Sequence, residues 1–338
     1  MTDLLKLIRF RQWWTYKIAP ALGIFLLFRS NNPDAFNTKD IFHLALLTIS
    51  LSVAATFTSI SNDLADMESD SIAGKPNRLS GWMRTEVYQL LAVIISTGAA
   101  TTLLLPGITL KKVCLLLWSN WTLYSFEPFR AKNRGLAGPL LDAAGSHVLP
   151  CIMAVLLSGF RPESQPLLVF LAVLWSFLWG LRGIFWHQLY DFEYDQKSAV
   201  KTLPGVAGYS RTLFIGEKLL FPAETLAIVA LLGLMQPLLL IPFFLCVVME
   251  ITGDVNGAVR RTVLQPGGMN LLFLTDFYTL VLPISIFLVR PVSDLAFACL
   301  FPVLFFSDYS ERIFADYRIL YKSWRSIKHK SANPKQGK

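Results

Sequence analysis

The sequence predicts an all-α fold, a polytopic transmembrane helical bundle of about nine to ten spans around a central cavity, capped by cytoplasmic Asp-rich loops. Composition is the first reason: hydrophobic residues make up 54% of the 338 residues and charged residues only 16%, whereas soluble domains carry about 25% charged residues. Charge distribution is the second, because segments 41–61 and 87–108 contain no Lys, Arg, Asp or Glu, and a membrane-crossing helix needs about 20 apolar residues. These observations exclude a soluble domain, a disordered chain and a disulfide scaffold.

Ten apolar segments follow one another along the chain, and hydropathy places them at 13–28, 41–61, 86–108, 112–126, 136–160, 166–190, 219–235, 237–252, 269–289 and 292–308. With the N-terminus inside, the first four inner segments carry thirteen Lys and Arg residues and the first three outer segments carry five. Cytoplasmic loops are enriched in these residues. We therefore expect a multi-pass integral membrane protein with both termini in the cytoplasm.

The net charge of +8 is concentrated at the C-terminus. Segment 310–338 holds eight basic and two acidic residues directly after the last apolar run, and the anionic cytoplasmic leaflet attracts such segments. We expect a transmembrane domain over 1–309 and a basic cytoplasmic tail over 310–338, with the lipid bilayer as partner and no nucleic acid. The four cysteines show no CxxC spacing, so neither a zinc site nor a disulfide framework is indicated.

The second span ends in an acidic segment, Asn62-Asp63-Leu64-Ala65-Asp66-Met67-Glu68-Ser69-Asp70. Helical residues advance by about 100° each, so positions three or four apart lie within about 60° of one another. If the helix continues past the span, Asn62, Asp63, Asp66 and Asp70 share one face and Glu68 points away. The sequence thus predicts a row of oxygen ligands at one end of this helix.

The sixth span ends in a second acidic segment, Tyr190-Asp191-Phe192-Glu193-Tyr194-Asp195. Asp191 and Asp195 lie about 40° apart on a helix, and Glu193 opposes them. Five aspartates at one membrane surface repel one another unless a cation lies between them, and a site made only of oxygen ligands favours Mg²⁺. Solvated helix ends are the alternative reading, but two motifs in register on the same side favour the metal.

Basic residues accompany both motifs: Lys75, Arg78, Arg130, Lys132, Lys197 and Lys201. The positive-inside bias alone accounts for basic residues in these loops. Mixed carboxylates and cations also suit a metal-bridged diphosphate, because Lys and Arg bind the phosphate oxygens that the metal leaves free. Such a headgroup above a bundle with 25 Phe and 9 Trp residues indicates an isoprenoid diphosphate substrate.

At these residues the chain resembles the UbiA-type superfamily of intramembrane prenyltransferases, which includes membrane-bound terpene cyclases. The resemblance covers roughly residues 1–290 and is carried by Asn62-Asp63-x-x-Asp66-x-x-x-Asp70 with Arg78, Tyr124-Ser125-x-x-Pro128-x-Arg130-x-Lys132, and Asp191-x-x-x-Asp195-x-Lys197-x-x-x-Lys201. It implies a Mg²⁺ cofactor held by Asp63, Asp66, Asp70, Asp191 and Asp195. It implies diphosphate contacts from Asn62, Lys75, Arg78, Tyr124, Arg130, Lys132, Lys197 and Lys201.

Three polar residues lie inside the sixth span, where ionisable groups are functional candidates. His187 is one turn before Asp191 and Gln188 is near Asp195 in rotation, so both share the metal face and are expected to line the cavity. A hydrogen-bonded packing role for His187 is the alternative. Arg182 faces away, and we expect it to pair with Glu250 or Asp276.

Asp142, near the inner end of the fifth span, is expected to be a helix-start acid rather than a catalytic residue. The catalytic candidates are Asp63, Asp191 and His187. Three functions remain open: a prenyltransferase with an unknown acceptor, a terpene cyclase that needs no acceptor, and an ion-coupled transporter. The transporter is disfavoured because the acids gather at span ends on one side rather than at the midplane. We favour the prenyltransferase, the more frequent of the two enzymes.

Overall fold

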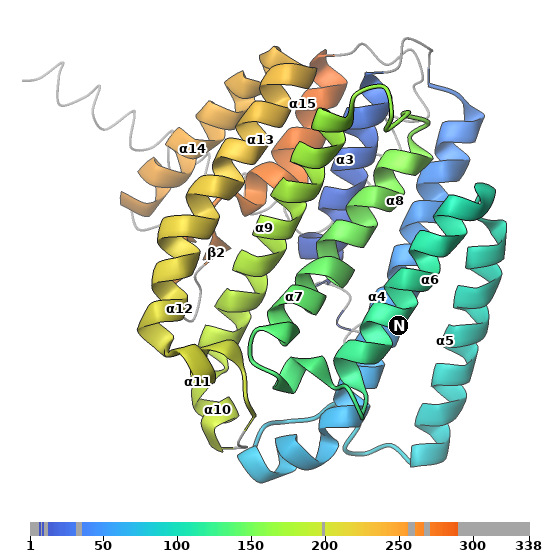
Figure 1. The fold of residues 1–338 in the computed structure, drawn as a ribbon, viewed down its shortest axis with the longest axis vertical. Coiled ribbons are helices and arrows are strands. Elements are labelled where there is room, and N and C mark those ends of the chain that lie inside the picture. The colour runs from blue at the N-terminus through green and yellow to red at the C-terminus, as the bar shows by residue number, and fades with distance from the viewer. Residues whose placement is uncertain are drawn as a thin grey trace, which may run out of the picture.

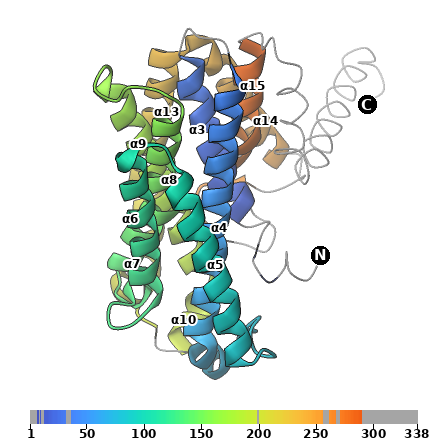
Figure 2. The ribbon, with the colours of Figure 1, turned by 90° about the vertical axis from the view of Figure 1, so that its right-hand side faces the viewer.

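The structure, a computed structural model, describes residues 13–31, 36–197, 200–255, 261–266 and 271–289, together with residues 7 and 9. Its long helices run side by side in one elongated bundle (Figures 1 and 2). The helices are α3 (Ala19–Ser30), α4 (Thr38–Ala73), α5 (Arg84–Leu104), α6 (Gly107–Ser125), α7 (Ala137–Ala143), α8 (Leu149–Leu157), α9 (Pro166–Tyr190), α10 (Phe192–Lys197), α11 (Leu203–Ala207), α12 (Tyr209–Ile215), α13 (Phe221–Met235), α14 (Leu240–Val255) and α15 (Leu282–Val289). The prediction of an all-α bundle is confirmed.

Within the described residues, five helical stretches are long and apolar enough to cross a membrane: Thr38–Ala73, Arg84–Leu104, Ala137–Leu157, Pro166–Tyr190 and Tyr209–Met235. Pro237–Thr252 and Phe277–Val289 are shorter apolar helices. Several of these stretches are continuous through π-helical turns, at Ala144–Val148 between α7 and α8 and at Gly216–Leu220 between α12 and α13. The expected span 292–308 and the tail 310–338 lie outside the described residues.

Helix α4 is the longest of these helices and reaches well beyond its apolar segment. It begins at a capping box, in which Asn37 Oδ1 accepts from Lys39 N at 2.9 Å and Asp40 Oδ2 accepts from Asn37 N at 2.9 Å. It ends at Gly74, whose φ of 67° is the left-handed conformation that glycine adopts without penalty. The helix therefore continues through Asp63, Asp66 and Asp70, which is the condition for these residues to share one helical face.

Helix α9 packs against both α7 and α13. Trp175 and Trp179 stack on its face with ring centroids 5.7 Å apart, and the Tyr278 ring meets both edge-on at 5.0 and 5.1 Å. These rings are almost fully buried, and such aromatic pairs add to the stabilisation from burial. This part of α9 is thus tightly packed, and Asp191 follows at the C-terminal end of the helix.

Two boundaries differ from the sequence expectation. The turn between α5 and α6 lies at 105–106, not at 109–112, because Pro106 precedes the first residue of α6 and Gly107 has a φ of 70°. The expected span 269–289 is helical only in its second part. Before it, β2 (Leu271–Leu272) pairs in parallel with β1 (Arg261–Thr262), and Leu274 has a φ of 68°.

Arg182 explains how this non-helical segment is tolerated inside the bundle. The expected partners, Glu250 and Asp276, were wrong: fully buried Arg182 donates to both carboxylate oxygens of Glu224, at 2.6 and 2.7 Å. It also donates to the carbonyl oxygens of Val263 at 3.0 Å and Phe273 at 2.9 Å. Backbone polar groups that leave a helix at membrane depth need such protein partners. Arg182 does face away from the cavity described below, as predicted.

The expected partner acids belong to a second arginine. Arg261 donates to Asp276 Oδ2 at 2.7 Å and lies 3.9 Å from Glu250. Glu250 in turn accepts from the backbone nitrogen of Leu274 at 2.8 Å. Two buried arginine–acid clusters therefore hold residues 261–263 and 273–276 against α9, α13 and α14. Sequence spacing gave no means of assigning these three acids and two arginines to their partners across different helices.

Candidate active site

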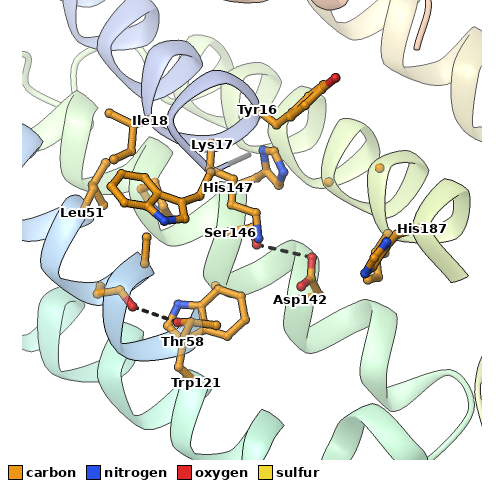
Figure 3. A pocket seen from close by; sticks show the side chains of 18 of the residues that line it. Tyr16, Lys17, Ile18, Leu51, Thr58, Trp121, Asp142, Ser146, His147 and His187 are labelled. Carbon is orange, nitrogen blue, oxygen red and sulfur yellow. Dashed lines mark hydrogen bonds between the residues drawn. The ribbon is translucent and has the colours of Figure 1, made fainter. Parts of the chain in front are cut away.

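A cavity of about 440 Å³ lies inside the bundle, lined by residues of the π-helical turn Trp14–Ile18, α4, α6, α7, α8 and α9 (Figure 3). This volume is in the range of pockets that hold small organic ligands. Much of the wall is aromatic, with side chains from Trp13, Trp121, Trp179 and Trp186. Asn62 and His187, near the two aspartate motifs, line its mouth.

Asp63 lies at the mouth as the partner of two guanidinium groups. Arg78 donates to both of its oxygens, at 2.6 and 2.8 Å, and Arg9 donates to Oδ1 at 2.8 Å. The carboxylate is buried, with 4% of its side chain exposed. Asn62, on the preceding position of α4, accepts from the Ser125 hydroxyl, which ties α4 to the end of α6.

Asp66, one turn further along α4, binds the loop between α6 and α7. Lys132 forms an ion pair with its Oδ1, and Arg130 donates to the same oxygen at 3.0 Å and to the Ala65 carbonyl oxygen at 2.9 Å. Arg130 has a φ of 32°, a left-handed conformation uncommon outside glycine and concentrated at functional sites. Burial lowers the pKa of Lys132, although the charge of Asp66 opposes this shift.

Asp70 and Asn77 fold the loop after α4 back onto the helix. Asn77 Nδ2 donates to Asp70 Oδ2 and to the Asp63 carbonyl oxygen, both at 2.8 Å. Its own Oδ1 accepts from the Leu79 backbone nitrogen at 2.9 Å. This turn places Lys75 and Arg78 over the aspartates instead of leaving them in solvent. Asn77 was not among the predicted site residues.

Lys75 connects the two aspartate motifs. Its Nζ donates to Asp191 Oδ2 at 2.6 Å. Burial alone would lower the pKa of Lys75, but the hydrogen bond and charge of Asp191, with the charges of Asp70 and Asp195, raise it above its usual value. The motifs from α4 and α9, far apart in the sequence, therefore face each other across one mouth, at the end of the bundle drawn lowest in Figure 1.

The second motif straddles a helix break. Helix α9 ends at Tyr190, Asp191 caps it, and α10 carries Asp195. The single continuous helix expected here is therefore wrong, although Asp195 N still donates to Asp191 O at 3.0 Å. Burial and the charge of Asp191 raise the pKa of Asp195 to about 6. Both effects make the ionised form of Asp195 less favourable than it is in water.

The two glutamates of the motifs are exposed, as the helical-face argument predicts for Glu68 and Glu193. Lys197 and Lys201 are also exposed, and in the described part of the chain neither forms an ion pair with an aspartate. The Lys197 ammonium lies 5.6 Å from the Tyr194 ring centroid. Tyr124 is buried against Trp121, with ring centroids 5.5 Å apart. Among the described residues, none of these three predicted diphosphate contacts forms a hydrogen bond or ion pair with an aspartate of the motifs.

Among the polar residues expected in the cavity, His187 is found there. Its Nε2 lies 3.9 Å from Asp191 Oδ2 and its side chain is 53% exposed. Gln188, by contrast, is buried and accepts from the Leu203 backbone nitrogen at 3.3 Å, so the expectation that it lines the cavity is wrong. It fixes α11 to α9 instead.

Asp142 is not the helix-start acid that we expected. It is the sixth residue of α7, lines the cavity, and accepts from Ser146 Oγ at 3.3 Å (Figure 3). Sequence reasoning also passed over Arg9, Lys17 and His147, which line the same cavity. Lys17 and His147 both lie in predicted spans, so the rule that singled out Arg182 and His187 would have found them.

Solved structures of other proteins have a similar fold. The structure resembles a UbiA homolog from Archaeoglobus fulgidus bound to DMAPP and Mg²⁺, with a TM-score of 0.53 and 15% identity over 94% of this chain and 98% of that one. The same homolog bound to GPP and Mg²⁺ matches with a TM-score of 0.54, 16% identity and coverages of 94% and 99%. Its Cd²⁺-bound form matches with a TM-score of 0.59, 18% identity and coverages of 85% and 98%. At these sequence identities, the similarity shows that the fold is shared.

No curated protein matches the sequence. The sequence profile of the UbiA prenyltransferase family, however, matches residues 18–253, which covers α3 to α14 and both aspartate motifs. With several apolar helices of membrane-spanning length, the chain is an integral membrane protein, and it belongs to the UbiA prenyltransferase family.

Proposed function

We propose that this protein is a Mg²⁺-dependent intramembrane prenyltransferase that ionises an isoprenoid diphosphate and transfers the prenyl group to an acceptor. One observation carries the proposal: two aspartate motifs, linked by Lys75 and Asp191 at 2.6 Å, face each other over a cavity walled by tryptophans. A polar mouth over an apolar cavity suits a substrate with a diphosphate head and a hydrocarbon tail. The fold relatives that bind DMAPP or GPP with Mg²⁺ support the same reading.

The aspartates fit a divalent cation by their chemistry. Carboxylate oxygens are the ligands that Mg²⁺ prefers, and the pKa of Asp195, raised to about 6 by burial and by Asp191, indicates negative charge that a cation would relieve. In the described part of the chain no three acidic, His or Cys side chains are gathered around one point; Lys and Arg side chains bind the carboxylates instead. Asp63, Asp66, Asp70, Asp191 and Asp195 would hold the metal once those pairs rearrange.

The chain's own cations account for the rest of the diphosphate site. Lys75, Arg78, Arg130 and Lys132 all lie within hydrogen-bond distance of an aspartate, where they are placed to bind phosphate oxygens. Mg²⁺, when bound, supplies positive charge that stabilises the departing diphosphate. The bond between C1 and the bridging oxygen breaks with its electron pair going to diphosphate. The acceptor then donates an electron pair to C1 and loses a proton, which His187 is positioned to accept.

A terpene cyclase remains the second candidate, and the tryptophans favour it. Four indole rings line the cavity, and aromatic faces stabilise cations. The polar side chains of Lys17, Asp142 and His147 in the same cavity favour the transferase instead. A hydrocarbon cation that only rearranges has no use for them, and an ammonium group repels it.

The fate of the prenyl cation separates the two enzymes. Purified protein in detergent would be incubated with Mg²⁺ and geranyl, farnesyl or geranylgeranyl diphosphate, without an acceptor, and the organic products identified by mass spectrometry. A transferase gives slow turnover and prenyl alcohol by capture of water. One abundant cyclic hydrocarbon, absent from the Asp63→Ala control, would establish the cyclase and overturn the transferase.

A further inference from the structure

The loop between α6 and α7 brings two cations to the first aspartate motif. Lys132 forms an ion pair with Asp66. Arg130 donates to the same carboxylate, but it also donates to the Ala65 carbonyl oxygen at 2.9 Å, which fixes it to the backbone of α4. Lys132 lies in the 3-10 helix Ala131–Asn133, and its ammonium is at the end of a flexible side chain. The place of this ammonium therefore depends on how the loop is held.

The far end of this loop is bonded to the chain that follows the second motif. Gly135 N donates to the Lys201 carbonyl oxygen at 2.8 Å, and residues 135 and 202 form an isolated parallel β-bridge. Gly135 has a φ of 54°, a left-handed conformation that glycine adopts without a steric penalty. Gly135 is three positions after Lys132 in the chain. The bond to Lys201 therefore limits how far the backbone of Lys132 can move.

Gln188 holds the partner segment on α9. Its side chain is buried, and its Oε1 accepts from the Leu203 backbone nitrogen at 3.3 Å. Leu203 begins α11 and is buried in an apolar cluster with Phe185 and Leu189 of α9. Apolar contacts are non-directional, whereas a buried N–H that loses its acceptor is costly. The hydrogen bond from Leu203 therefore fixes the register of segment 200–203 along α9.

These contacts connect the two aspartate motifs by a second route. The first route is the bond between Lys75 and Asp191. The second begins at Gln188, three positions before Asp191 on α9, and runs through segment 200–203 and the loop between α6 and α7 to Asp66. Helices α10 and α11 lie at the same end of the bundle as the motifs, drawn lowest in Figure 1. The loop that carries Lys132 is thus held from the α9 side as well as by α4.

We propose that Gln188 and Gly135 are positioning residues, which hold the Lys132 ammonium over the first aspartate motif where it binds a phosphate oxygen. The inference rests on the proposed function and adds two residues that act on the diphosphate through a third. A charge-assisted bond to phosphate needs the ammonium in a defined place. A loop that is free to move loses conformational entropy when a ligand orders it. The two residues therefore strengthen the binding of diphosphate through Lys132.

The test measures the binding of inorganic diphosphate with Mg²⁺ to the full chain in detergent by calorimetry, so that no prenyl transfer is needed. Gln188→Met keeps the length of the side chain but removes the acceptor, and it should weaken binding about tenfold. Gly135→Ala disfavours the left-handed φ and should weaken binding at least about threefold. Gln89→Met, which changes an exposed glutamine of α5, should leave the affinity unchanged.

Double variants show whether the effect acts through Lys132. In a Lys132→Met background, Gln188→Met should weaken diphosphate binding by less than about twofold, because the ammonium that it positions is absent. In a Lys75→Met background, where a phosphate-binding lysine of the other loop is missing, the same change should still weaken binding about tenfold. Lys112→Met, which removes an exposed lysine of α6, is the control background. A merely structural role of Gln188 would lower the affinity equally in all three backgrounds.

Two results would overturn the inference and leave the proposed function intact: equal effects of Gln188→Met in all backgrounds, or wild-type affinity in both Gln188→Met and Gly135→Ala. A wild-type protein that does not bind diphosphate with Mg²⁺ would refute the proposed function, and the inference with it. Thermal unfolding of each variant identifies one that does not fold, and the same double variants made with the other substitution then decide.

Discussion

Lys75 Nζ donates to Asp191 Oδ2 at 2.6 Å, and this contact joins the loop after α4 to the end of α9. The two residues are 116 positions apart in the chain. A cation that bridges the two aspartate motifs must compete with this ammonium, and a diphosphate must attract it away. Lys75 should therefore weaken the binding of the metal and strengthen the binding of the diphosphate.

Lys75→Met should raise the affinity for Mg²⁺, because a competing positive charge next to Asp191 is removed. The same variant should weaken the binding of a prenyl diphosphate about tenfold, because one charge-assisted phosphate contact is lost. Calorimetric titration of Mg²⁺ alone, and then of geranyl diphosphate with Mg²⁺, measures both. Lys112→Met is the control. Weaker Mg²⁺ binding in Lys75→Met would show that the lysine supports the metal site rather than competing with it.

The buried pair of Arg182 and Glu224 should be essential for stability. Glu224→Gln leaves a fully buried guanidinium without its counter-charge, and breaking such a pair costs about 3–5 kcal/mol. The free energy of unfolding in detergent, measured by chemical denaturation, should fall by that amount. Arg211→Met, which changes an exposed arginine on α12, should change it by less than about 0.5 kcal/mol. A small effect for Glu224→Gln would show that Val263 and Phe273 are held by contacts other than those of Arg182.

Two glycines of α9 line the cavity but differ in the space around them. A Cβ at Gly180 would lie 2.8 Å from His147 Cδ2 and 3.0 Å from Ala143 Cα, whereas a Cβ at Gly183 meets nothing within 4 Å. Gly180→Ala should therefore destabilise the protein by about 1–3 kcal/mol through overpacking. Gly183→Ala should be neutral or stabilising, since alanine favours the helix. Thermal unfolding of the two variants side by side checks this, and equal melting temperatures would contradict the packing of α7 on α9.

Much of the fold and part of the site could be predicted because both depend on local periodicity. The face of α4 that carries Asp63 and Asp66, and the exposure of Glu68, follow from residue spacing within one helix. Pairing between side chains of different helices does not follow from residue spacing, because it depends on how each helix is rotated against its neighbours. The sequence therefore predicted the wrong partner for Arg182, which pairs with Glu224. It also predicted that Gln188 lines the cavity, whereas Gln188 is buried against Leu203.

The position of Asp142 shows a further limit. The chain enters α7 at Ala137 after the loop that carries Arg130 and Lys132, so Asp142 lies more than one turn inside the helix. Hydropathy placed the start of this span at 136, one residue before α7 begins, so the error was in the role of Asp142 and not in the boundary. Whether a side chain faces the cavity depends on how its helix is rotated against its neighbours. The end of α9 at Tyr190 agrees with the expected span 166–190, but the break before α10 was missed, because the apolar pattern ends there and does not show whether the helix continues.

Topology is a prediction that the described residues leave open, because the last apolar run and the basic tail lie outside them. Ten spans place the C-terminus in the cytoplasm with the N-terminus. A C-terminal reporter that is active only in the cytoplasm should therefore be active in cells. Activity from a reporter specific for the outer compartment would mean that segment 292–308 does not cross the membrane.

The central claim is that the aspartates, and not the neighbouring glutamates, hold Mg²⁺ and drive loss of diphosphate. The most direct measurement is the rate of Mg²⁺-dependent diphosphate release from a prenyl diphosphate in Asp63→Asn, Asp191→Asn, Glu68→Gln and Glu193→Gln. The two asparagine variants should fall by at least about a hundredfold, as expected when groups that stabilise developing charge are removed. The two glutamine variants should retain the wild-type rate, because those side chains are exposed and face away. Glutamine variants as inactive as the asparagine variants, or asparagine variants with full activity, would contradict the account.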